Sequence, residues 1–256
     1  SRSPIKDRPL RLPGQSFADE RDRILEDKLT LPLIAAVMLV VLAGLEWWRY
    51  FVPHPPSPWT ATFMATMGVA YLVWQVSRYL PRLKQLRQAI DGERAVGQCL
   101  ERLRAEGYHV FHDLIGDGFN VDHAVVGPAG VFTIETKTWS KPAGGEPMID
   151  FDGERIVAHG HEPDRDPVVQ AKAQSSWLRR LIGETTGRRV AVRPVVVFPG
   201  WFVKQSEGST RDVWVLEPKA LPGLLAHEKN HLSPEDVKLI SFHVSRFIRA
   251  EEGRKA

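Results

Sequence analysis

The sequence has little cysteine and little net charge, and each shortage limits what the protein can be. Cys99 is the only cysteine among 256 residues, so no disulfide can form within the chain and a cysteine-rich zinc site is excluded. A single thiol suits a reducing compartment. The formal net charge is +3, and residues 78–256 carry 26 basic and 24 acidic side chains. Overall charge therefore does not predict nucleic-acid binding, and a basic binding surface would have to be local.

Two long runs of the sequence lack charge altogether. Residues 29–45 contain no charged side chain and approach the length that a membrane-spanning helix needs. Trp47 and Trp48 follow, and aromatic residues are common where a spanning helix meets the membrane surface. After a proline-containing loop, a second uncharged run spans residues 59–77. We predict that the two runs form a transmembrane helical hairpin. The alternative is a buried helical pair of a soluble protein, although such helices usually carry a polar stripe.

Lysine and arginine lie on both sides of this hairpin, whereas the loop inside it has only Arg49. The positive-inside rule then predicts a multi-pass protein of a bacterial-type inner (plasma) membrane, with both termini in the cytoplasm. Four segments follow along the chain: a cytoplasmic polar tail (1–28), the membrane hairpin (29–77), a basic linker helix (78–90) and a cytoplasmic domain (91–256).

Periodicity and turn residues give the order of elements in the cytoplasmic domain: helix, three strands, an extra hairpin, helix, strand, strand, helix. The first helix is predicted over residues 92–105, which places Glu93 in its first turn, where a carboxylate suits the helix dipole. Asp166 is predicted to cap the second long helix, whose first residue is Pro167. The apolar stripe predicted for that helix consists of Val169, Ala173, Trp177 and Leu181.

The central hairpin carries the main functional signal. Two strand-like runs flank a turn that begins at Gly127, and pairing of Val126 with Val131 would set Asp122 directly opposite Glu135. Opposed residues have Cβ atoms ~4.5–5.5 Å apart, and like charges placed so are destabilising. A divalent cation would offset the repulsion, because Mg²⁺ binds one or two carboxylates together with substrate phosphate.

Further polar residues have two interpretations each. Lys137 shares the strand face of Glu135 and would supply a positive charge beside the metal, yet such a pair is also common on a solvated face. Glu93 could reach the site as a third acid. Gln170 could orient the attacking water or the phosphate, or be an ordinary helix-surface amide. The pair His159 and His161 could bind a metal, although a polar loop favours solvation.

The order of elements, together with Asp122 and the run Glu135-Thr136-Lys137, resembles that of the PD-(D/E)XK restriction-endonuclease-like superfamily. Within this superfamily, the chain resembles the nuclease-related domain family, NERD. The matching pieces are Gly92-Glu93-Arg94-Ala95-Val96, the run VDHAVVGPAGVFTIETK from Val121 to Lys137, Asp166-Pro167-Val168-Val169-Gln170 and the strand VRPVVVF from Val192 to Phe198. The resemblance covers roughly residues 91–216. Two positions depart from the pattern: Val121 replaces the proline of the superfamily motif, and Gln174 stands where some relatives have tyrosine.

The resemblance implies an α/β fold with a restriction-endonuclease-like mixed sheet flanked by helices, and the two predicted transmembrane helices precede it. Taken together with these helices, the resemblance predicts a membrane-anchored, Mg²⁺- or Mn²⁺-dependent nuclease that acts on nucleic acid, with DNA favoured over RNA. Metal ligands would be Asp122, Glu135 and Glu93, and the further catalytic residues would be Lys137 and Gln170. Lys137 would stabilise the hydroxide or the developing phosphate charge. The alternatives are a non-catalytic nucleic-acid- or protein-binding module at the membrane and a membrane scaffold.

Overall fold

The structure is a computed structural model and describes residues 11–52, 58–116, 118–141, 144, 146–158, 166–206 and 212–255, without the side chains of 60, 61 and 252–255. The predicted proline-containing loop and the pair His159 and His161 lie outside these residues. The chain divides into two compact units. One comprises Ser16–Gln88, and the other comprises Ser1–Gln15 together with Ala89–Ala256.

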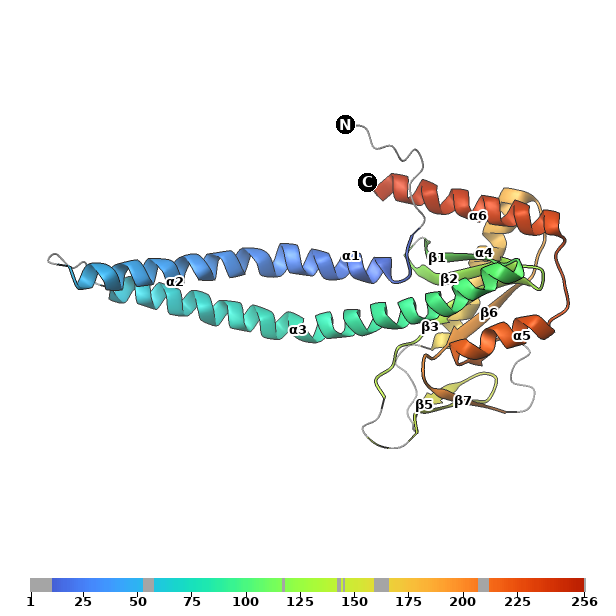
Figure 1. Cartoon of the computed structure of the whole chain (residues 1–256), viewed down its shortest axis with the longest axis horizontal. Coiled ribbons are helices and arrows are strands. Elements are labelled where there is room, and N and C mark those ends of the chain that lie inside the picture. The colour runs from blue at the N-terminus through green and yellow to red at the C-terminus, as the bar shows by residue number, and fades with distance from the viewer. Residues whose placement is uncertain are drawn as a thin grey trace. The chain divides into compact units, whose positions relative to one another are not determined.

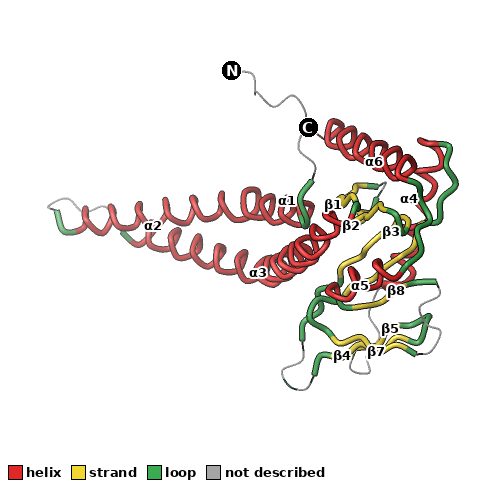
Figure 2. The backbone as a smooth tube through the Cα atoms, turned by 45° about the vertical axis from the view of Figure 1, so that its right-hand side comes forward, coloured by secondary structure: helices red, strands yellow, loops and turns green. Residues whose placement is uncertain are grey.

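The first unit is helical, as Figures 1 and 2 show. Helix α1 (Gln15–Arg23) continues through a wider helical stretch, η1 (Ile24–Thr30), into α2 (Leu31–Tyr50), so much of the predicted polar tail is helix. The segment Gln15–Tyr50 is long and apolar enough to cross a membrane. Core helices of soluble proteins and signal sequences can be equally long and apolar. In this helix, however, only 6% of the most apolar stretch is buried.

The prediction of two spanning helices is met only in part. Among the residues that the structure describes, Gln15–Tyr50 is the one helix that is long and apolar enough. The second predicted span lies in α3 (Trp59–Glu101), where threonine, tryptophan and glutamine interrupt the apolar residues and lower the mean hydropathy. Helices α2 and α3 contact each other within this unit, where Leu39 packs on Gly68 and the Trp47 indole N–H donates to Thr62 at 3.0 Å.

Helix α3 also corrects the predicted start of the first helix of the α/β domain. No break occurs near Gly92, and Pro81 lies inside the same continuous helix. Glu93 is therefore in a helix interior, and the predicted interaction with a helix N-terminus is wrong. The predicted stop is confirmed: after a tight helical turn, η2 (Arg102–Glu106), the chain ends the helix at Gly107 with φ of 85°.

The α/β domain is built on a mixed five-stranded sheet in the order β1-β2-β3-β6-β8. Its strands are β1 (His109–Ile115), β2 (Asn120–Gly127), β3 (Gly130–Thr136), β6 (Val192–Val197) and β8 (Trp214–Leu216). Strands β1, β2 and β3 are antiparallel, whereas β6 and β8 continue parallel to β3. The predicted register is confirmed, because Val126 pairs with Val131. Gly127 also pairs with Gly130, so only two residues form the loop.

Helices cover both faces of this sheet. Helix α4 (Pro167–Thr186) and helix α6 (Pro234–Lys255) share one apolar core with β1, β2 and β3 (Figure 1). On the opposite face, the C-terminal end of α3 packs through Leu100, η2 through Leu103 and α5 (Leu221–His227) through Leu225. A tight turn, η3 (Pro218–Ala220), precedes α5. The observed α/β class with a mixed sheet flanked by helices agrees with the prediction.

A second, three-stranded sheet has the order β5-β4-β7. The predicted extra hairpin supplies β4 (Met148–Phe151) and β5 (Ile156–Ala158), and β7 (Phe202–Gln205), which the sequence did not reveal, pairs parallel to β4. Apolar residues of β4 and β5 pack with those of β6, β8 and α4 in a third core cluster. This sheet therefore extends the fold beside the five-stranded sheet.

The buried face of α4 differs from the predicted stripe. Asp166 caps the helix as predicted, since its carboxylate accepts a hydrogen bond from the Val168 N–H at 2.8 Å. The inward residues are Pro167, Val168, Ala171, Gln174, Ser175, Leu178 and Ile182. Val169, predicted to be inward, is 62% exposed. Two polar side chains thus take buried positions, and the reason lies in the site that α4 covers.

Candidate acidic site at the sheet edge

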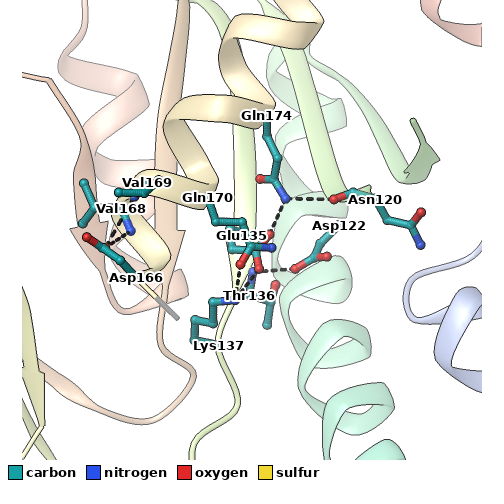
Figure 3. Close-up of polar contacts among 10 residues, drawn as sticks. All are labelled: Asn120, Asp122, Glu135, Thr136, Lys137, Asp166, Val168, Val169, Gln170 and Gln174. Atoms are coloured by element: carbon teal, nitrogen blue, oxygen red, sulfur yellow. Dashed lines mark hydrogen bonds and ion pairs between the residues drawn. The ribbon is translucent and has the colours of Figure 1, made fainter. Parts of the chain in front are cut away.

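The site begins where β2 and β3 lie side by side. Continuing the register from the pair His123 and Ile134 sets Asp122 opposite Glu135. Beyond this pair, a side chain takes part in the hydrogen bonding between the two strands: the Thr136 N–H donates to the Asp122 side chain at 2.7 Å (Figure 3). The Lys137 N–H then donates to the Val197 carbonyl at 2.9 Å, which keeps β3 beside β6. The two acids therefore lie at the carboxyl ends of the parallel strands, where open α/β sheets bind ligands.

Lys137 joins this strand end to helix α4. Its Nζ donates to Glu135 Oε1 at 2.6 Å and to Gln170 Oε1 at 2.8 Å. The Lys137 and Glu135 side chains are only 19% and 4% exposed, so solvent screens their ion pair weakly. The structure thus brings together Glu135, Lys137 and Gln170, three of the five predicted site residues, through direct contacts (Figure 3).

Gln174 is a member of the site that sequence reasoning did not assign. Its Nε2 donates to Glu135 Oε2 at 2.5 Å and to the Asn120 carbonyl at 2.8 Å. Both oxygens of Glu135 are therefore fixed, one by an ammonium and one by an amide (Figure 3). The signal available in the sequence was the i, i+4 spacing of Gln170 and Gln174, which places both amides on one flank of α4.

Glu93 approaches the same site from α3. It is 4% exposed, and the Gly14 N–H donates to its Oε2 at 2.6 Å. Its carboxyl group is close enough to interact electrostatically with those of Glu135 and Asp122. The structure therefore gathers all five predicted residues in one region. Glu93 is also held by a backbone amide from a segment 79 residues away in sequence.

Asp113 adds a fourth acid that the sequence analysis missed. The pairs His112–His123 and Leu114–Val121 flank it, which places Asp113 beside Asp122 on the neighbouring strand. Among the described residues, Asp113 is the one non-glycine with positive φ, 52°, a costly conformation that persists only where its surroundings impose it. Its carboxylate accepts hydrogen bonds from Arg11 Nε at 2.8 Å and Asn120 Nδ2 at 3.3 Å. Three strands thus each contribute one acid to a single row.

The crowding of carboxyl groups changes their protonation. Burial, followed by repulsion from Asp113 and Glu135, raises the pKa of Glu93 to about 8, although the Gly14 N–H opposes the shift. Burial, followed by the charges of Glu135 and Glu93, raises the pKa of Asp122 well above its usual value, against the Thr136 N–H and Lys137. The cluster therefore holds protons, or needs cations, near neutral pH.

The carboxylates fit a hard divalent cation by their chemistry, since Mg²⁺ uses oxygen ligands and one or two protein carboxylates. Among the described residues, however, no group of three or more His, Cys, Asp or Glu side chains is arranged to hold a metal ion. Lys137 and Gln174 hydrogen-bond the two oxygens of Glu135, and the Gly14 N–H donates to Glu93. Asp122 and Glu135 are the two carboxylates whose oxygens suit such a cation as ligands.

A second polar group lies on the opposite side of β2. His123 is fully buried, and its Nδ1 is 2.8 Å from Nδ1 of His112. His112 Nε2 in turn is 3.0 Å from Glu101 Oε1. Burial lowers the pKa of both histidines, so neither ring is favoured as a cation. This chain of contacts does not include the acidic cluster.

One sizeable cavity of the described structure lies away from the acids. It has a volume of about 780 Å³, and it is lined by the starts of β3 and β6 together with Lys172, Arg189 and Arg193. The acids lie at the other ends of these two strands. The cavity contains none of the acids described above. The candidate site is therefore identified by its contacts and charges.

Fold and site together define an α/β domain with an acidic, lysine-containing site at the edge of a mixed sheet. Residues 88–199 of this domain match the family model described as NERD, nuclease-related domain. The match supports assignment of this region to the NERD family, in agreement with the resemblance of the sequence motifs. Neither the comparison with curated proteins nor that with solved structures gave a match.

Proposed function

We propose that the protein is a metal-dependent nuclease that hydrolyses phosphodiester bonds of nucleic acids. The observation that carries this proposal is the convergence of Asp122, at the start of β2, with Glu135 and Lys137, at the end of β3, where Gln170 of α4 contacts the lysine. The nuclease-related domain match supports the same activity. A solvated pair on a strand face would not explain why Glu135 is 4% exposed and fully hydrogen-bonded.

In this proposal Asp122 and Glu135 hold Mg²⁺ or Mn²⁺, and Glu93 is a further ligand or a water-mediated partner. The bound cation supplies Lewis-acid polarisation of the phosphate oxygens. Lys137 places a positive charge where negative charge develops on the phosphate, and little reorganisation is needed because two side chains already orient its ammonium group. Gln170 acts by orienting Lys137, and Gln174 by fixing the second oxygen of Glu135.

We further propose that the apolar helix anchors this domain to a membrane. Large apolar side chains of α2 are exposed along its length, for example Met38 at 60% and Val41 at 55%. Exposed apolar surface of this extent marks contact with lipid or with a partner. We propose that the second predicted span, residues 59–77, returns the chain across the membrane. Basic residues then lie outside both spans, with Arg21 and Lys28 before the first and Arg78 and Arg82 after the second, and the positive-inside rule favours a cytoplasmic location for the nuclease-related domain.

A second function is supported by a different observation. The carboxylates are largely satisfied by groups of the protein itself, and no described cluster of three ligands is arranged for a metal. Such a closed network would suit a domain that binds nucleic acid or a protein partner without cutting. Fold alone does not establish activity, so the two functions have to be separated by measurement.

The test is cleavage of labelled DNA and RNA by the purified full-length protein in mild detergent, with and without Mg²⁺ or Mn²⁺. We expect metal-dependent cleavage that falls at least ~10²-fold in Glu135→Gln and Asp122→Asn, the size of effect seen when one electrostatic contact to a transition state is removed. The matched control is Glu184→Gln, an exposed acid of α4. Circular dichroism verifies that the variants fold.

The same variants distinguish the alternatives. Metal binding that is detected by calorimetry and weakened in Asp122→Asn, together with cleavage, supports the enzyme. Nucleic-acid binding without cleavage of either substrate supports the binding module. Cleavage that persists at the wild-type rate in both folded variants would exclude this site as the catalytic centre.

A further inference from the structure

A second cavity, with a volume of about 470 Å³, lies on the α/β unit beside the start of β1. Its polar lining consists of Arg11, Arg94, Gln98, Glu101, Arg104 and His112. The volume is within the range of roughly 300–1,000 Å³ that small-molecule sites occupy. None of the acids at the sheet edge lines this cavity, so it is separate from the site proposed for cleavage.

Three parts of the chain build the walls. Arg94, Gln98 and Glu101 recur at i, i+4 and i+7 along one face of α3. The segment 11–13 forms a second wall, and Pro13 lies so close to Gly97 of α3 that a side chain at position 97 would displace it. Strand β1 supplies the third wall through Val110, Phe111 and His112.

Two of the polar residues are buried, which shows that the cavity is more than an exposed patch. Arg11 and His112 are each 8% exposed. Arg11 is held by Asp113, with its Nη2 2.7 Å from Oδ2 of that carboxylate. His112 is held by its contacts with Glu101 and His123. Both side chains therefore keep fixed positions at the cavity wall without a ligand.

The charges of the cavity are not balanced. Arg104 pairs with Glu101, with its Nη2 3.0 Å from Oε1, and Arg11 pairs with Asp113. Arg94 makes no ion pair or hydrogen bond with another described residue. Three guanidinium groups therefore line one cavity, and two carboxylates pair with them: Glu101 in the lining and Asp113 outside it. Each guanidinium has five N–H donors, so the paired arginines can also donate to a further acceptor.

We propose that this cavity binds a phosphate monoester carried on a group of nucleotide size. Guanidinium groups match the geometry of phosphate oxygens and bind them in a bidentate manner. A dianionic phosphate beside Arg94 offsets the excess positive charge. The wall of Leu12, Pro13 and Val110 offers apolar surface to the remainder of the ligand. A free nucleotide and the phosphorylated 5′ end of a strand share this chemistry.

Arg11 connects the two sites, because the guanidinium that lines the cavity also neutralises Asp113 in the acid row. Binding in the cavity does not require that the acidic site cleave anything. The proposal therefore stands apart from the proposed nuclease activity, and either can fail without the other.

The experiment measures binding by calorimetry to the full-length Glu135→Gln variant, in which cleavage is not expected. Its probes are inorganic phosphate, adenosine 5′-monophosphate and a short oligonucleotide with and without a 5′-phosphate. We expect saturable binding of at least one organic phosphate monoester, and binding roughly 10- to 100-fold weaker when Arg94→Gln is added, since hydrogen bonds between charged groups have this magnitude. Arg180→Gln, an exposed arginine of α4, is the matched control and should change nothing.

Preference for the nucleotide identifies a free ligand, and preference for the phosphorylated oligonucleotide identifies a strand end. Either result supports the cavity if binding depends on Arg94. The proposal is overturned if no phosphate monoester binds at millimolar concentration. It is also overturned if Arg94→Gln binds as tightly as the control variant, because the ligand would then occupy another place.

Discussion

Protonation of Glu93 provides a quantitative test of the acid cluster. Its pKa in the folded protein is raised from 4.5 to about 8. Each pKa unit corresponds to 1.36 kcal/mol, so the raised pKa means that the folded protein favours the protonated over the ionised carboxyl group by about 5 kcal/mol more than water does. The side chain is 4% exposed, so solvent screening does little to reduce the effect.

The direction in which pH changes the stability follows from how many protons the folded and unfolded states bind. The folded protein holds the proton to higher pH than the unfolded chain does, so the unfolded chain binds fewer protons between pH 4.5 and about 8. The free energy of unfolding therefore decreases as pH rises through this window. The contribution is fully present below pH 4.5 and lost above about 8. Between pH 6 and pH 9 we expect a loss of about 3 kcal/mol from this group.

The assay is urea unfolding of the full-length protein in mild detergent with a chelator, at pH 6, 7, 8 and 9, followed by circular dichroism. Glu93→Gln keeps an oxygen that can accept the Gly14 N–H and removes the titration. We expect the variant to lose about 3 kcal/mol less stability than the wild type across this range and to exceed the wild type at pH 9, and any decrease that remains comes from Asp122. The exposed-acid variant Glu184→Gln should follow the wild type.

Two results would refute the reasoning. One is a wild-type protein whose stability does not decrease between pH 6 and 9. The other is a Glu93→Gln protein that shows the same decrease as the wild type, because the titrating group would then lie elsewhere. Either result would mean that Glu93 is not protonated beside Asp113 and Glu135 as its burial requires.

Two further predictions concern the N-terminal part of the chain. Arg11→Met should lower the free energy of unfolding by about 3–5 kcal/mol, because it leaves Asp113 buried without its counter-ion. Adding Asp113→Asn should restore most of the loss. An Arg11→Met protein whose stability in urea unfolding is within 1 kcal/mol of the wild type would contradict this prediction. Expressed in bacteria, the full-length protein should stay in the membrane pellet after alkaline carbonate extraction, and Val40→Arg in α2 should release part of it, since an arginine at the centre of a span costs about 2.5–3.5 kcal/mol. Release of the wild type by carbonate would contradict the anchor.

Local patterns in the sequence determined much of this fold. Alternation of apolar residues and the turn at Gly127 predicted the β2–β3 hairpin and its register, because a slip of one residue would turn Val126 and Val131 to the wrong face. The Asp166-Pro167 pair predicted the start of α4, because a side-chain cap and a fixed φ act within one helical turn. These features depend on neighbours in sequence, so the sequence is enough to find them.

Only the tertiary structure decided which polar residues meet. Gln174 is buried against Glu135 from 39 positions away, and Arg11 reaches Asp113 across 102 positions. No local periodicity encodes such pairs, and periodicity alone favoured Val169 over Gln174 for the inner face of α4. Likewise, the start predicted near Gly92 failed because a helix continues wherever packing and propensity permit, even without an apolar stripe. The residue types of the acidic site were thus readable in the sequence, whereas their partners and protonation depend on folding, which sets burial and distance.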